Sequence, residues 1–314
     1  MAVRSLKLWE PLNPGDLVDV VAPGFAIPQD KLLGARLFLE NLGLKARIPQ
    51  DIFGSDILCS NSDAVRLRHL KQAFTSKDSK AVWCLRGGYG AIRILEGFSK
   101  IKKPTRNKLF VGYSDTTTLH NYINQFWGFA TLHGPLLDRL GQNTLPQNQV
   151  SELAELVFGH RHKVAFENLK PLNEAARKKK RIKSCVVGGN LVVTEAHLGT
   201  SYMRAPRGQI LFFEDIGERG YRVDRSLYHL QMAGYFKNIL GIVFGEFVGG
   251  EETNGETLVP RVLERFAQEQ KFPVFSGVEA GHGNSQRAVP LGTEAELICG
   301  ERGTLHIHSG AHEL

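Results

Sequence analysis

Residues 17–43, LVDVVAPGFAIPQDKLLGARLFLENLG, contain the pattern that decides the fold. The apolar run 17–22 is rich in β-branched residues and stops at Pro23 and Gly24, which predicts a buried strand. From Gln29 to Leu42 the apolar residues recur at helical spacing, and a glycine follows them. The segment therefore predicts one strand followed by one helix.

The same unit recurs along the first half of the chain. Further strands are predicted at 46–48, 81–85 and 109–113, each followed by a helical stretch, the last of which runs to about residue 127. Repeated strand–helix units predict parallel strands joined by right-handed crossovers, with helices on both faces of the sheet. Ligands of such sheets gather at the carboxyl ends of the strands, which here lie after Ala22, Arg86 and Tyr113.

The second half has a similar α/β pattern after a weaker region. Strands are expected at 182–187, 209–213, 239–247 and 274–278, helices at 191–198, 222–233 and 258–270, and a closing hairpin at 295–308. Between about 142 and 183 polar and basic residues dominate. We therefore expect an N-terminal domain over 1–150, a linker over 151–183 and a C-terminal α/β domain over 184–314.

Composition limits the possible functions. The 314 residues suffice for two domains. We expect no secretory signal at the start of the chain, and no later stretch has an apolar run of membrane-spanning length. The net charge of +7 is densest at 177–183, but that run is short and lacks the interleaved aromatic residues that stack on bases. We expect a cytoplasmic protein that binds neither membrane nor nucleic acid.

The cysteines indicate no special chemistry. The four residues are widely scattered, without a C-x-x-C pair or a histidine at ligand spacing, at positions Cys59, Cys84, Cys185 and Cys299. Neither a disulfide framework nor a zinc site is predicted.

Ser114 is the strongest candidate for a catalytic residue. It follows the predicted strand directly and precedes a helix, so a sharp turn would project its hydroxyl out of the sheet beside free backbone N–H groups. Thr116 stands where the hydrolase pattern G-x-S-x-G requires glycine. A helix N-cap is the alternative role for Ser114.

A serine nucleophile requires a base and an acid that orients it. His282 follows a predicted strand between two glycines, whereas four other histidines lie in a polar linker, a terminal hairpin or the tail: His162, His306, His308 and His312. Glu214 ends a strand that is apolar throughout, where a carboxylate requires a partner such as an imidazole. Asp215 is a competing acid, and a pairing of Glu214 with Arg219 or Arg222 is the alternative.

With these residues collected, the sequence resembles the LD-carboxypeptidase family of serine peptidases, which includes muramoyltetrapeptide carboxypeptidases and microcin-C immunity peptidases. The resemblance rests on motifs in the family's order over nearly the whole chain: Pro14-Gly-Asp16, Val21-Ala-Pro23, Arg86-Gly-Gly-Tyr-Gly90, Gly112-Tyr-Ser-Asp-Thr-Thr117, His133-Gly-Pro135, Phe213-Glu-Asp-Ile216, Tyr221-Arg-Val-Asp-Arg225 and Gly281-His-Gly283.

The resemblance implies a catalytic triad of Ser114 as nucleophile, His282 as general base and Glu214 as its orienting acid. It implies an oxyanion site made by backbone N–H groups near Gly88 and Asp115. The N-terminal half would resemble a class I glutamine amidotransferase or flavodoxin-like domain, followed by a smaller C-terminal α/β domain. The family is usually homodimeric and uses neither a metal nor an organic cofactor.

The implied reaction is release of the terminal D-Ala from a muropeptide tetrapeptide in cell-wall recycling. The alternative within the family is hydrolysis of a toxic aminoacyl-nucleotide by an immunity peptidase, although no aromatic-rich insertion for stacking an adenine is evident. An alternative of another class is a binding protein that keeps the scaffold without chemistry.

Overall fold

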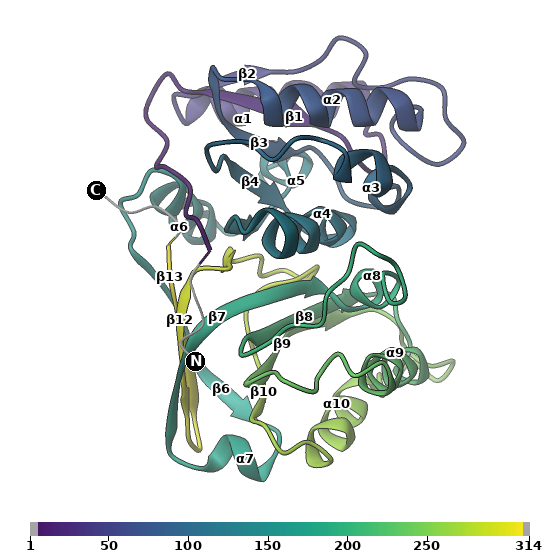
Figure 1. The fold of residues 1–314 in the computed structure, drawn as a ribbon, viewed down its shortest axis with the longest axis vertical. Helices are drawn as coiled ribbons and strands as arrows, with labels where there is room; N and C mark the ends of the chain where they lie inside the picture. The colour runs from purple at the N-terminus through teal and green to yellow at the C-terminus, as the bar shows by residue number, and fades with distance from the viewer. Residues whose placement is uncertain (1–5, 310–314) are drawn as a thin grey trace.

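The computed structural model describes residues 6–309, which form two α/β regions stacked one above the other (Figure 1). The first half of the chain builds one region and most of the second half builds the other (Figure 1). None of the helices in this part of the chain is both long and apolar enough to cross a membrane.

The first region contains a six-stranded sheet in the order β11-β5-β4-β3-β1-β2. Five strands are parallel: β1 (Leu17–Val21), β2 (Lys45–Arg47), β3 (Ser79–Cys84), β4 (Leu109–Gly112) and β5 (Thr131–His133). The sixth, β11 (Val289–Leu291), comes from the far end of the chain and pairs antiparallel with β5.

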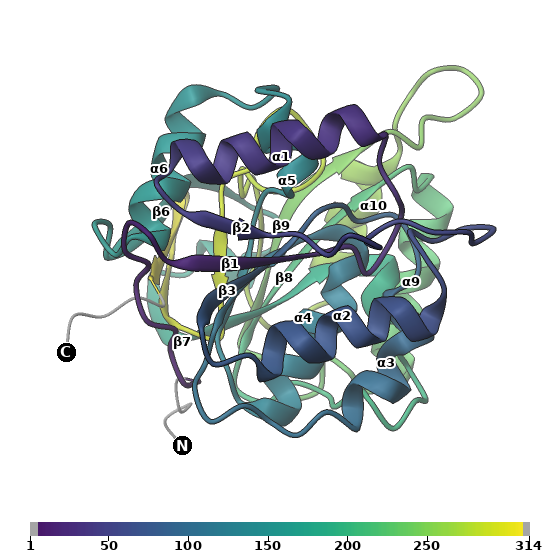
Figure 2. The ribbon, with the colours of Figure 1, turned by 90° about the horizontal axis from the view of Figure 1, so that it is seen from above.

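Helices cover both faces of this sheet (Figure 2). One face carries α1 (Gln29–Asn41), α5 (Leu137–Gly141) and α6 (Gln147–Val157), and the other carries α2 (Asp63–Thr75), α3 (Ala91–Ser99) and α4 (Thr117–Tyr122), which continues into η2 (Ile123–Trp127). Alternate strand residues pack against opposite faces, since Val20 and Val111 join the cluster under α1 whereas Val21 and Phe110 join the one under α2 and α3.

The second region contains a seven-stranded sheet that closes on itself in the order β10-β6-β13-β12-β7-β8-β9. Its strands are β6 (Lys163–Pro171), β7 (Lys180–Asn190), β8 (Ile210–Ile216), β9 (Gly241–Val248), β10 (Val274–Ser276), β12 (Glu294–Cys299) and β13 (Gly303–His308). Strands β7, β8, β9 and β10 are parallel, and the rest pair antiparallel. The helices are α7 (Glu174–Arg177), α8 (Leu191–Glu195), α9 (Gly220–Met232) and α10 (Val259–Gln268).

The mixed α/β class is confirmed, with a parallel-rich first sheet and a separate second sheet. The expected hairpin is confirmed by the antiparallel pairing of β12 with β13. The stretch 151–183 differs from the expected linker, because it holds most of α6, all of β6 and α7, and the start of β7. The sequence of its strands is polar because one face of each strand is exposed. In β7 the side chains of Arg181 and Lys183 are exposed, while Ile182 between them is buried.

Candidate active site

Ser114 lies at a sharp turn between β4 and α4. It begins η1 (Ser114–Thr116), its φ is 65°, and its side chain is partly exposed. A positive φ is uncommon for a residue other than glycine and is typical of strained turns at functional sites. Neither η1 nor α4 has a side-chain capping hydrogen bond, so the alternative role of Ser114 as an N-cap finds no contact to support it among the described residues.

The glycine loop after β3 packs directly against Ser114. A Cβ atom added to Gly87 would lie 2.9 Å from Ser114 Cβ and 3.1 Å from Oγ, so only glycine permits this approach. Gly88 has a φ of 95°. Among the described residues, the N–H of Gly88 donates none of the hydrogen bonds that join turns and loops.

The side chain of Asp115 anchors this turn. Its Oδ2 accepts a hydrogen bond from the backbone N–H of Ala91 (2.9 Å), the first residue of α3. Burial raises the pKa of Asp115 to about 6, although the N-terminus of α3 and Arg66 oppose that shift. The carboxyl group of Asp115 therefore ties the turn of Ser114 to the end of the glycine loop.

Glu214 and His282 form the central contact of the site. Glu214 lies on β8 and is fully buried, and its Oε2 accepts a hydrogen bond from His282 Nδ1 at 2.6 Å. Burial raises the pKa of Glu214, but the neighbouring charges of His282 and His133 outweigh this effect and the net shift is downward. An ionised Glu214 fixes the tautomer of His282 that leaves Nε2 free to act as a base.

His282 lies beside the turn that carries Ser114. Its ring centroid is 4.7 Å from that of Tyr113, the residue directly before Ser114. The His282 loop is held by hydrogen bonds from Gly283 N to Glu246 Oε2 (2.9 Å) and from Gln286 Nε2 to Gly281 O (2.8 Å). The three predicted residues thus converge from both regions, although the described residues include no direct hydrogen bond between Ser114 and His282.

The alternatives to Glu214 have other partners. Asp215 accepts hydrogen bonds from Asn190 Nδ2 (3.1 Å) and Val192 N (2.9 Å), because successive strand residues point to opposite faces. Burial and the charge of Glu214 raise the pKa of Asp215 to about 7. Arg219 pairs with Glu252, and Arg222 lies 3.6 Å from Glu218, so neither arginine neutralises Glu214.

His133 is a site residue that the sequence reasoning did not assign. It ends β5, is buried, and places Nε2 at 3.8 Å from Glu214 Oε1. Both ring nitrogens and Oε1 are without a hydrogen-bond partner. The available signal was its place in the motif His133-Gly-Pro135 at the end of an apolar run, 129–132, which was not assigned as a strand.

The cysteine side chains are all buried and unpaired. Within residues 6–309 no group of three or more His, Cys, Asp or Glu side chains is arranged to hold a metal ion.

Comparisons with known proteins agree on one family. The LD-carboxypeptidase N-terminal domain matches residues 18–134, and the LD-carboxypeptidase C-terminal domain matches residues 183–297. The probable murein peptide carboxypeptidase of Bacillus subtilis is 35% identical over 307 residues, covering 96% of this chain and 94% of the relative. The murein tetrapeptide carboxypeptidase of Pseudomonas aeruginosa is 30% identical over 298 residues, covering 93% and 96%.

A solved structure supports the same conclusion. The muramoyltetrapeptide carboxypeptidase of Oxalobacter formigenes superimposes with a TM-score of 0.81 at 26% identity, covering 93% of this chain and 98% of that one. An MccF-like protein of Bacillus anthracis has the same fold, with a TM-score of 0.82 at 21% identity. Together these matches show that the chain belongs to the LD-carboxypeptidase family and is a serine-type carboxypeptidase.

Proposed function

We propose that this protein releases the terminal D-Ala from muropeptide tetrapeptides, with Ser114, His282 and Glu214 as its catalytic triad. The observation that carries the proposal is the buried Glu214–His282 hydrogen bond of 2.6 Å beside the turn that presents Ser114. The relatives named as murein peptide carboxypeptidases support the substrate class. A muropeptide is anionic, in keeping with the net charge of +7.

In the proposed mechanism Ser114 Oγ attacks the carbonyl carbon before the terminal D-residue. His282 Nε2 takes the hydroxyl proton and then gives it to the leaving amine, so that D-Ala departs and an acyl-enzyme remains. Water then attacks the ester with the help of the same imidazole. The backbone N–H groups of Gly88 and Asp115 would stabilise the negative charge on the carbonyl oxygen.

In this proposal the two domains supply different members of the triad. Residues 1–150 would form the nucleophile domain, similar to a class I glutamine amidotransferase or flavodoxin-like domain, and 184–314 would carry Glu214 and His282. Turnover would then depend on how the two domains dock. The family resemblance supports a homodimer that acts on its substrate in the cytoplasm.

The test is release of free D-Ala from L-Ala-D-Glu-diaminopimelate-D-Ala. The native protein should release D-Ala with or without a chelator, and Ser114→Ala should lower the rate by on the order of 10⁴-fold or more. Ser151→Ala, on the exposed face of α6, is the matched control and should retain full activity.

A parallel assay distinguishes the alternatives. Cleavage of an aminoacyl-nucleotide without D-Ala release would favour the immunity peptidase, and inactivity toward both substrates would favour a binding protein. Unchanged D-Ala release by Ser114→Ala would remove the proposed nucleophile.

A further inference from the structure

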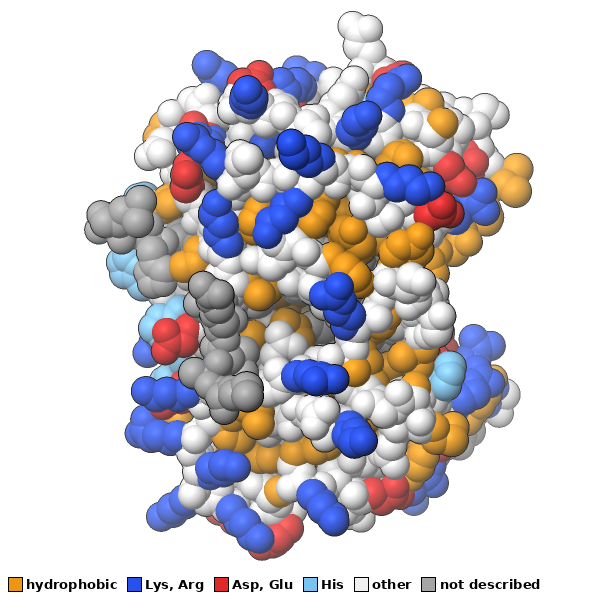
Figure 3. Space-filling view, in the orientation of Figure 1, with side chains coloured by type: hydrophobic (Ala, Val, Ile, Leu, Met, Phe, Trp, Pro, Cys, Tyr) orange, Lys and Arg blue, Asp and Glu red, His pale blue; other side chains and the backbone are white. Residues whose placement is uncertain are grey.

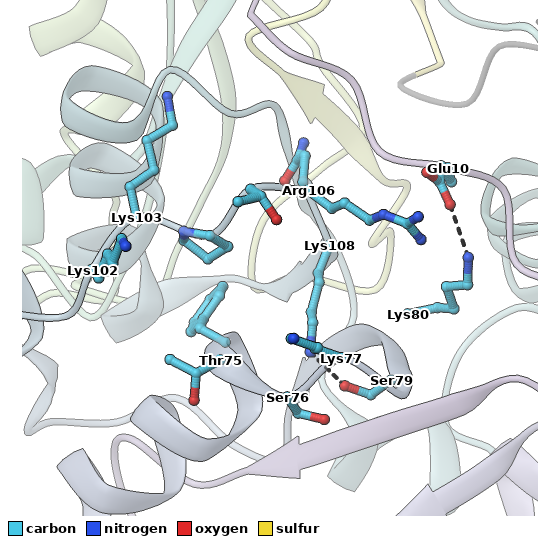
Figure 4. Close-up of a pocket in the computed structure, with 14 residues that line it drawn as sticks. Glu10, Thr75, Ser76, Lys77, Ser79, Lys80, Lys102, Lys103, Arg106 and Lys108 are labelled. Atoms are coloured by element: carbon cyan, nitrogen blue, oxygen red, sulfur yellow. Dashed lines mark hydrogen bonds and ion pairs between the residues drawn. The ribbon is translucent and has the colours of Figure 1, made fainter.

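A cavity lies at the opposite end of the first sheet from Ser114. It has a volume of about 510 Å³ and is lined by the end of α2, the starts of β3 and β4, and the segment between α3 and β4 (Figure 4). Strands β3 and β4 start at this cavity, whereas the glycine loop and Ser114 follow their other ends. The cavity is therefore separate from the catalytic groups.

The cavity wall is strongly basic. Of the side chains in residues 6–309, six cationic ones line it and Glu10 is the only acidic one: Lys77, Lys80, Lys102, Lys103, Arg106 and Lys108 (Figure 4). On the face seen in Figure 3, Lys and Arg side chains are spread over both regions. The hollow thus gathers several cations, although Lys103 also lies over the ring of Phe129, with its Nζ 4.7 Å from the ring centroid.

Most of this positive charge is not neutralised by the protein. Glu10 is engaged with Lys80, whose Nζ lies 2.8 Å from Glu10 Oε2. Among the described residues, Lys77, Lys102 and Arg106 have no carboxylate within ion-pair distance. Cations held near one another repel, so an anion bound between them would relieve that repulsion.

Lys108 places an ammonium group at the base of the cavity, although burial lowers its pKa to about 8. This side chain is 9% exposed, and its ammonium group donates hydrogen bonds to Ala73 O and Ser79 Oγ, both at 2.6 Å (Figure 4). Asp19 Oδ2 lies 4.0 Å away. The ammonium group is therefore held in place, unlike those of the exposed lysines around it.

The shape and chemistry of the wall indicate one class of anion. A phosphate monoester carries about two negative charges on three oxygens, against the single charge of a carboxylate, so it suits a hollow lined by several cations better. Phe74 and Pro104 add an apolar surface beside them. The volume lies within the range of small-molecule sites and exceeds what a single inorganic phosphate would fill.

We propose that this cavity binds a small organic phosphate, with the phosphate among Lys77, Lys102 and Arg106 and an apolar or ring portion against Phe74 and Pro104. The inference does not depend on the proposed peptidase activity.

The experiment is a calorimetric titration of the whole protein with phenyl phosphate, which combines a ring with a phosphate. A triple variant, Lys77→Gln, Lys102→Gln and Arg106→Gln, removes the proposed phosphate contacts. Its matched control, Lys178→Gln, Lys179→Gln and Lys183→Gln, removes three exposed charges from the basic run in the second region. Phenol and benzoate test whether the phosphate is required.

We expect one saturable site for phenyl phosphate, weakened about tenfold or more in the cavity variant and unchanged in the control. Phenol and benzoate should bind at least about tenfold more weakly. No saturable binding, equal losses in both triple variants, or benzoate binding as tight as phenyl phosphate would each overturn the proposal. The cavity variant should retain the D-Ala release and melting temperature of the native protein.

Discussion

The two ends of the first sheet hold their polar groups in opposite ways. At the carboxyl end, Asp115 and, from the second sheet, Glu214 are buried and hydrogen-bonded, and the loop of His282 is fixed by several contacts. At the amino end, most cations of the cavity are exposed and unpaired on long flexible side chains. Catalysis requires groups fixed before the substrate arrives, whereas binding of an anion tolerates groups that adjust to it.

The largest effect that tests this contrast is expected for Glu214→Gln. The substitution keeps the shape of the side chain but removes the charge that orients His282, so kcat for D-Ala release should fall by on the order of 10³- to 10⁴-fold. Steady-state kinetics and circular dichroism would show whether the loss occurs in a folded protein. A larger loss of kcat in Asp215→Asn than in Glu214→Gln would instead identify Asp215 as the acid.

His133→Gln tests whether His133 belongs to the group of buried side chains that hold Glu214 in place. His133 Nε2 lies 3.8 Å from the unpartnered Glu214 Oε1, so its loss should loosen Glu214 and lower kcat roughly tenfold, with KM within about twofold of the native value. His69→Gln is the control, because His69 is also buried but contacts Asp51, far from the catalytic groups. A raised KM with unchanged kcat would contradict a positioning role.

Asp215→Asn tests whether the buried carboxyl group next to Glu214 in the sequence makes stability depend on pH. The raised pKa of Asp215, about 7, means that the folded protein binds this proton more tightly than the unfolded chain, whose ordinary value is 3.8. The native free energy of unfolding should therefore fall as pH rises from 4 to 7, by at most about 1.4 kcal/mol per pH unit from this group. Denaturant unfolding of the native protein and of Asp215→Asn at several pH values would measure this fall. If the free energy of unfolding changes with pH equally in both proteins, the raised pKa of Asp215 is refuted.

The smallest effect is expected at the amino end of the sheet. Lys102→Gln alone should weaken phenyl phosphate binding only about threefold, because each exposed cation contributes little and its neighbours can compensate. The same titration at low and high salt should show affinity falling as salt rises. A complete loss of binding from this single change would mean that the cavity is as rigidly organised as the catalytic end.

Local pattern was sufficient to predict four strands of the first sheet, β1 to β4, and the three candidate catalytic residues, but it predicted neither β5 nor β11. Each strand and its helix are neighbours in sequence, and Ser114, Glu214 and His282 each follow or end a strand whose apolar run is continuous. Closure of the second sheet was not predictable in this way, because it depends on pairings such as β6 with β10 and β13, over 90 residues apart. The charged outer faces of β6 and β7 also hid their inner apolar positions.

The role of His133 and the basic cavity depend on contacts of the same long-range kind. His133 meets Glu214 from a strand about 80 residues away, and the cavity combines Glu10 with loops near 77 and 106. No window of sequence contains either arrangement.

The pairing of β11 with β5 has a consequence for how the protein is made. The first sheet acquires its last strand only when residues 289–291 have left the ribosome, although β5 was synthesised about 150 residues earlier. During that interval β5 presents an unpaired edge, which is prone to join other chains. The loop that carries His282 lies just before β11, so docking of that strand also delivers the histidine. If His282 acts as proposed, the nascent chain remains inactive until residues 282–291 have left the ribosome.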